Sequence, residues 1–115
     1  MIPQNYQALI DKLILGTNMK KISWKKTSRQ TEFQTSVGSG TITTDNWKDD
    51  TTDMTYVDFV IWNDEGEAID SISAFKGDED YDSIMQLHEC ARRAYLKIDE
   101  TINDIMNHLD FNIQY

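Results

Sequence analysis

The residues best suited to chemistry lie in the segment GDEDYDSIMQLHE, residues 77–89. Its oxygen-bearing side chains recur at the spacing of the ligands in a calcium-binding helix–loop–helix. The positions that match the ligand pattern are Asp78, Asp80, Asp82, Ile84, Gln86 and Glu89. Two features oppose this interpretation: Ser83 replaces the glycine that the loop requires, and a helical pattern already runs through the segment. We therefore expect Asp80 to cap a helix, with calcium binding as the alternative.

Histidine and cysteine offer no second site. The chain holds only His88, His108 and Cys90, whereas a zinc site needs about four ligands. Cys90 lacks the electropositive setting that activates a nucleophilic thiol. No phosphate loop, nucleophile elbow or acid–base pair is recognisable either. The sequence therefore predicts no catalytic residues, no cofactor and no metal.

The elements that carry these residues begin with a helix at 3–15, in which Pro3 suits the first position and Gly16 the left-handed stop. Alternating apolar residues then predict strands, at 22–27, 32–37, 41–44, 54–62 and 67–75. The acidic stretch 45–53 is predicted to be a loop. Strands this closely spaced leave no room for parallel crossovers, so we expect an antiparallel meander of four or five strands.

The last third of the chain is helical. Apolar residues recur at alternating steps of three and four from Tyr81 to Leu109, interrupted only by His88. A break near Asp99, a second candidate cap, would divide this segment into two helices. The predicted fold class is therefore α+β in a single domain, residues 1–115, with an N-terminal helix, the meander and a long C-terminal helix.

The strand at 54–62 carries apolar side chains on both of its faces. Tyr56, Val60 and Trp62 share one face, and Val57 and Phe59 share the other. If both helices pack on the second face, the first stays open as an apolar patch for a partner. If one helix covers each face, the patch is simply core. Both arrangements fit the sequence.

The net charge is −9, and it is unevenly distributed. Residues 1–29 carry six basic groups and one acid, a net of +5, whereas residues 30–115 carry nineteen acids and five basic groups, a net of −14. Such a surface repels nucleic acid and attracts a basic protein. The expected contacts are two clusters, Asp49, Asp50 and Asp53, and Asp64, Glu65 and Glu67.

The predicted C-terminal helix is too long for short strands to cover. The apolar residues at its end are Ile102, Ile105, Met106 and Leu109. They must be buried against the N-terminal helix, through Leu9, Leu13 and Ile14, or against a second copy across a two-fold axis. We favour the homodimer, because the N-terminal helix is short and is also needed on the sheet.

The single cysteine, the absence of a signal-peptide pattern and the lack of a long apolar run favour a cytoplasmic protein with no membrane association. Three segments also resemble a group of small uncharacterised proteins of bacteria and their mobile elements: KISWKKT at 21–27, EGEAIDSIS at 65–73 and the helical segment 81–109. This resemblance implies the fold and a bacterial or phage origin, and it carries no catalytic residue.

These observations together predict an acidic protein-binding module rather than an enzyme. An inhibitor, an adaptor or an immunity-like factor acting on a basic protein surface would fit. The alternative is a small-molecule or metal-binding domain that uses the acidic segments 45–53 and 78–89.

Overall fold

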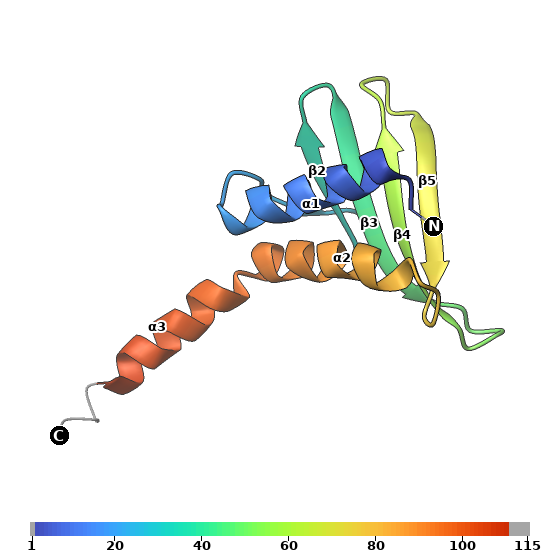
Figure 1. Ribbon diagram of the computed structural model, residues 1–115. Helices are drawn as coiled ribbons and strands as arrows, with labels where there is room; N and C mark the ends of the chain where they lie inside the picture. Colours follow the sequence, from blue (N-terminus) through green and yellow to red (C-terminus); the bar gives the residue numbers. More distant parts are fainter. Residues whose placement is uncertain (1, 111–115) are drawn as a thin grey trace.

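The computed structural model describes residues 2–110 (Figure 1). Residue 1 and residues 111–115, which the single-domain prediction includes, lie outside the described part. The elements in chain order are α1 (Gln4–Asn18), β1 (Lys25–Lys26), β2 (Glu32–Val37), β3 (Gly40–Lys48), β4 (Thr55–Trp62), β5 (Ala68–Phe75), α2 (Tyr81–Leu96) and α3 (Ile98–Asp110). The predicted α+β class, with an N-terminal helix, an antiparallel sheet and a helical last third, is confirmed.

The five strands form a meander in the order β1-β2-β3-β4-β5, and every neighbouring pair is antiparallel. β3 and β4 form the centre of the sheet, while β5 lies at one edge. Because side chains alternate along a strand, β4 directs Val57 and Phe59 to one face and Tyr56, Val60 and Trp62 to the other.

Both α1 and α2 lie on the same face of the sheet, side by side (Figure 1). The core forms between them and that face, and it comprises chiefly Ile10 and Leu13 of α1, Ile84, Leu87 and Ala91 of α2, and Phe33, Ile42, Val57, Phe59 and Ala74 of the sheet. Burial of this apolar surface is the main force that holds the layers together. Of the two arrangements that the sequence allowed, the structure has the one that leaves the Tyr56 face uncovered by helices.

The end of α1 differs from the prediction. Gly16 does not stop the helix, which continues to Asn18, and the left-handed residue is Lys20, with φ 61°. A Cβ atom at Gly16 would lie 2.6 Å from Cδ1 of Ile22, so the glycine serves the close approach of the returning chain. The Trp24 indole then donates a hydrogen bond to the Thr17 hydroxyl at 2.9 Å, which ties the end of α1 to the segment before β1.

Two strand boundaries were also predicted wrongly. β1 contains only Lys25–Lys26 of the predicted 22–27, and β3 continues to Lys48 through half of the predicted loop 45–53. The extension of β3 is held by bonds to β4: the Asn46 amide donates to the Tyr56 carbonyl at 3.0 Å, and the Trp47 indole donates to Asp58 at 2.8 Å. Tyr56 and Asp58 lie ten or more residues further along the chain. The polar residues 45–48 considered by themselves therefore predict a loop.

The C-terminal helix is broken, as one form of the prediction allowed, but at Lys97 rather than at Asp99. Lys97 has a left-handed backbone, with φ 54° and ψ 44°, and α3 begins at the next residue. α3 therefore projects away from the sheet and from α1 (Figure 1). From Asp99 to Asp110 every one of its residues is exposed. None of the helices within residues 2–110 has the length and apolar character needed to cross a membrane.

Candidate functional site

The acidic segment 78–89 does not form a loop around an ion. α2 begins at Tyr81, so Asp82, Gln86 and Glu89 lie on successive turns of a helix. The Glu89 carboxylate is bound by the Arg92 guanidinium at 2.8 and 3.0 Å, which lowers the pKa of Glu89 below its usual value. Within residues 2–110, no three carboxylate, cysteine or histidine side chains are grouped so that they could hold a metal.

Asp80 precedes α2 as predicted, but its carboxylate makes no capping hydrogen bond to the helix. Its Oδ1 atom instead accepts the backbone N–H of Ile2 at 3.1 Å. Asp80 therefore occupies the predicted N-cap position but does not make the expected capping bond. Asp80 links the start of the chain to the start of α2, across the layer of two helices.

Carboxylates of the second acidic segment, 45–53, also form ion pairs and hydrogen bonds within the protein. Asp45 is buried, with Arg29 at 2.8 Å and the Thr31 hydroxyl at 2.5 Å. Asp53 pairs with Lys48 at 2.8 Å, across the hairpin between β3 and β4. These carboxylates do not converge, so the geometry gives the metal-binding alternative no common centre.

A groove of about 740 Å³ lies between the end of α1, the segment 20–24 and the junction of α2 with α3. Its lining mixes Lys20, Arg93 and Glu89 with the half-buried Cys90. Burial raises the pKa of the Cys90 thiol, which opposes its ionisation to a nucleophile. Within residues 2–110, no buried side-chain nitrogen or oxygen lacks a hydrogen-bond partner.

His88, the one polar residue in the heptad pattern, is a core residue. It is 4% exposed, its Nδ1 atom lies 3.2 Å from the Thr44 hydroxyl, and its ring packs at 5.5 Å from that of Phe33. Burial lowers the pKa of His88, while the charges of Asp45 and Glu89 act in the opposite direction. His88 is therefore a neutral structural side chain near pH 7.

This burial predicts a pH dependence of stability. An unfolded histidine titrates near pH ~6.5, whereas folded His88 titrates lower, so acid protonates the unfolded state first. We expect the free energy of unfolding to fall as the pH is lowered through ~6.5 toward the pKa of folded His88. Urea unfolding between pH ~8 and ~5 measures this loss.

The control for this measurement is the other histidine. His108 is exposed on α3, so His108→Gln should keep the wild-type slope of unfolding free energy against pH. His88→Gln should flatten that slope, whatever its effect on stability at pH ~8. A wild-type slope in His88→Gln would show that other groups carry the pH dependence.

The face of the sheet opposite the helices holds Tyr56, Val60 and Trp62, but each of them is partly buried. The Tyr56 ring stacks on Trp47, with 4.7 Å between ring centroids, and the Trp62 indole donates to the Thr43 hydroxyl at 2.9 Å. The aromatic side chains therefore lie partly on one another and on the sheet. Trp47 was missed because it fell in a predicted loop, although it continues the alternation of Thr41 and Thr43.

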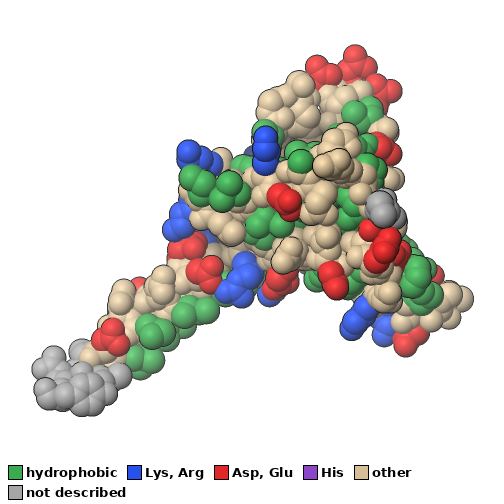
Figure 2. Space-filling model, viewed as in Figure 1, with side chains coloured by type: hydrophobic (Ala, Val, Ile, Leu, Met, Phe, Trp, Pro, Cys, Tyr) green, Lys and Arg blue, Asp and Glu red, His purple; other side chains and the backbone are tan. Residues whose placement is uncertain are grey.

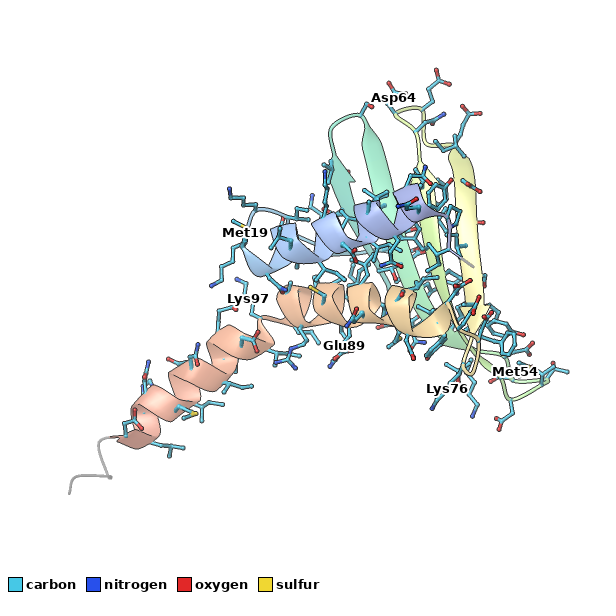
Figure 3. The ribbon with its side chains drawn as sticks, in the orientation of Figure 1. Met19, Met54, Asp64, Lys76, Glu89 and Lys97 are labelled. Carbon is cyan, nitrogen blue, oxygen red and sulfur yellow. The ribbon has the colours of Figure 1, made fainter. Side chains whose placement is uncertain are left out.

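The two acidic clusters expected to meet a partner lie at opposite ends of this face. Asp49, Asp50 and Asp53 belong to the hairpin between β3 and β4, next to Met54, whereas Asp64, Glu65 and Glu67 belong to the hairpin between β4 and β5 (Figure 3). β4 has eight residues, which separates the clusters by roughly 25 Å. They flank the open face and do not form one compact site.

The most exposed apolar side chains in a continuous row are those of α3. Ile102, Ile105, Met106 and Leu109 are 46%, 52%, 55% and 55% exposed. Figure 2 shows hydrophobic side chains gathered along one side of this helix. The alternative in which α1 covers them does not hold, because Leu13 is buried in the core and Leu9 and Ile14 pack against it.

The charges of α3 are of one sign. The helix carries Asp99, Glu100, Asp104 and Asp110 and no lysine or arginine. Asp99 pairs with Arg93 of α2 at 2.5 Å, across the junction of the two helices. The four residues predicted as a dimer contact are therefore brought together as one stripe on an acidic helix, which will be called the α3 stripe.

Comparisons with known proteins find no relative for this chain: no family model matches it, and neither does a curated protein nor a solved structure.

Proposed function

We propose that the protein is an acidic protein-binding module whose α3 docks into an apolar groove with a basic rim on a partner protein. The observation that carries this proposal is the α3 stripe, which projects from the body with about half of each side chain exposed. A row of apolar residues on a projecting helix costs free energy in water unless something covers it.

The spacing of the α3 stripe suits a groove. Ile98, Ile102, Ile105 and Leu109 recur at steps of four, three and four, the spacing by which an amphipathic helix anchors in a hydrophobic groove. Asp99 and Asp110 lie beside the stripe on the helix and would meet the basic rim, whereas Glu100 and Asp104 lie on the other side of α3. Electrostatic complementarity of this kind raises the association rate and rejects acidic partners.

A second copy of the chain is the rival occupant. Two-fold dimers are common, and an apolar stripe can pack against its own copy. Pairing two α3 helices would, however, bring together two helices that each carry four carboxylates and no lysine or arginine, from chains that each have a net charge of −9. Repulsion therefore disfavours the homodimer and favours a basic partner.

The open face of the sheet and its acidic hairpins have a supporting role in this proposal. The clusters Asp49, Asp50 and Asp53, and Asp64, Glu65 and Glu67, would steer a basic protein toward the molecule. Coverage of a basic functional surface is how an inhibitor or an immunity-like factor acts. The small-molecule or metal-binding alternative has less support, since its acidic segments pair internally and do not converge.

A site-specific photocrosslink tests the proposal. A photoreactive amino acid replaces Ile102 within the α3 stripe or Asn107 on the opposite side of α3, in the cells that produce the protein. We expect the first position alone to capture a partner. The captured protein, once purified, should bind with an affinity that falls as salt rises from about 50 to about 500 mM.

Other outcomes contradict the proposal. Capture of only a second copy at position 102 would identify α3 as a homodimer contact. Equal capture at positions 102 and 107 would show that the stripe is not what the partner recognises. An affinity that does not change with salt concentration would show that a basic rim does not contribute to binding.

A further inference from the structure

We infer that the outer edge of β5 is a second docking site, at which an extended basic segment of a partner protein adds a strand to the sheet. This surface is distinct from α3, so the inference stands whether or not α3 binds a groove. It is based on three features of β5: the direction of its main-chain groups, the residues along its edge and the charge at both of its ends.

The hydrogen-bond pattern shows which main-chain groups of β5 face outward. The Lys76 N–H donates to the Thr55 carbonyl at 2.8 Å, so the alternate residues Ala74 and Ile72 also pair with β4. Ser71, Ser73 and Phe75 consequently direct their main-chain groups away from β4. An incoming strand would meet both groups of Ser73, the carbonyl of Ser71 and the N–H of Phe75.

Two outward groups already have local partners. The Phe75 carbonyl accepts the Asp78 N–H at 2.9 Å, and the Ser71 N–H donates to Oδ1 of Asp70 at 2.9 Å. The Asp70 carboxylate is also bonded by the Tyr6 hydroxyl, which lowers the pKa of Asp70. Asp70 thus places a negative charge at the middle of the edge.

Apart from Asp70 and a register shift near Ile69, the edge lacks the usual protection against pairing. β5 has eight residues with neither proline nor lysine, and Ile69, Ser71, Ser73 and Phe75 are all exposed. Proteins commonly blunt such edges with those residues, or cover them with another element. In Figure 1, β5 is the outermost strand, and neither α1 nor α2 lies over its outer side.

Charge decides which strand can pair there. Residues 64–82, which include β5 and the turns at both of its ends, carry eight carboxylates and one lysine, a net of −7. Three carboxylates precede β5, Asp70 lies within it and four follow it. An extended segment with lysine or arginine at both ends and near its middle matches this distribution.

The same distribution excludes a second copy of the chain. Two β5 strands related by a two-fold axis would run antiparallel, which places residues 64–67 of one copy beside residues 78–80 of the other. Both stretches are acidic, so the pairing would bring like charges together at each end. Charge therefore favours the pairing of this edge with a basic strand and disfavours its pairing with a second copy of β5.

A peptide titration tests this inference on the intact protein. The probe is a peptide of about seven residues that alternates lysine and valine, a length that matches β5. In an NMR titration, we expect the amide signals of Ser71, Ser73 and Phe75 to shift and the hydrogen exchange of the Ser73 and Phe75 amides to slow. A peptide of the same charge with proline at its centre should bind at least about tenfold more weakly, because proline cannot donate to the ladder.

Protein variants supply the matched control. Ser73→Pro removes an outward N–H without touching the pairs with β4, and edge strands tolerate proline there. Ser73→Ala removes the hydroxyl that bonds Asp58 at 2.6 Å but keeps the N–H. We expect Ser73→Pro to lose peptide binding and Ser73→Ala to retain it. The proline-containing peptide still tests the pairing if Ser73→Pro does not fold.

Several results would overturn the inference. Equal binding of the alternating peptide and the proline peptide would mean attraction by charge alone. Equally tight binding of a peptide that alternates glutamate and valine would show that the edge does not select a basic strand. Slowed exchange at Ser73 that depends on protein concentration, with no peptide added, would identify a second copy as the occupant.

Discussion

Replacing Ile105 with aspartate is expected to weaken partner binding at least about 100-fold while changing the free energy of unfolding by less than about 0.5 kcal/mol. Ile105 lies at the centre of the α3 stripe and is 52% exposed, so its removal leaves no cavity in the core. In the complex, the new carboxylate would have to enter an apolar groove without a partner for its charge. Calorimetry with the captured partner measures the affinity, and urea unfolding measures the stability.

Asn107→Asp is the matched control for this variant. It adds the same charge to the same helix, on the side opposite the α3 stripe, and should change the affinity less than about threefold. Equal weakening by both variants would show that charge, and not the stripe, governs binding. Unfolding of Ile105→Asp would show that Ile105 belongs to the core of the domain. If the wild type sediments as a dimer and Ile105→Asp sediments as a monomer, the homodimer would be favoured instead.

The strands with strong local patterns were predictable from the sequence. β2 has the predicted bounds, and β4 and β5 begin one residue later than predicted, because branched and aromatic residues alternate in each. The end of β3 was not predictable in the same way. Asp45 is polar, yet it is buried by Arg29 and Thr31, which come from another part of the chain. Only tertiary contacts make such a residue compatible with a central strand.

The division of the last third into α2 and α3 was predictable only in part. The heptad pattern continues across Lys97 without a fault, so it cannot reveal the left-handed backbone there. That one residue decides whether the stripe lies against the sheet or projects into solvent. The choice of face on β4 is a similar case. Tyr56 and Phe59 are both aromatic, so the alternation alone does not say which face the helices cover, and the structure buries Phe59 beneath them.

The α3 stripe and the β5 edge lie on opposite sides of the molecule (Figure 1). Two partners, or two parts of one large partner, can therefore occupy them at the same time. Both surfaces are acidic, and the basic groups of residues 1–29 belong to α1 and the segment that follows it. This separation of charge favours one orientation of approach over the others.

Replacing Phe59 with alanine is expected to reduce the free energy of unfolding by about 3–5 kcal/mol, the largest stability effect of any single change proposed for this chain. Phe59 is fully buried on the helix-covered face of β4, with the Tyr6 ring 6.5 Å from its own. Its loss removes apolar contacts with both helices and leaves a cavity that the strands cannot close. A domain of this size is stable by only about 5–15 kcal/mol, so the variant should unfold at much lower urea.

Phe75→Ala is the matched control, because Phe75 is the same residue on the neighbouring strand but directs its side chain to the open face. Phe75 is 42% exposed, so its replacement should cost less than about 1 kcal/mol. The difference between the two variants measures how much of the stability comes from the face that α1 and α2 cover. Equal losses from Phe59→Ala and Phe75→Ala would mean that both faces of the sheet are buried in solution, and that the open face is itself covered by a partner or a second copy.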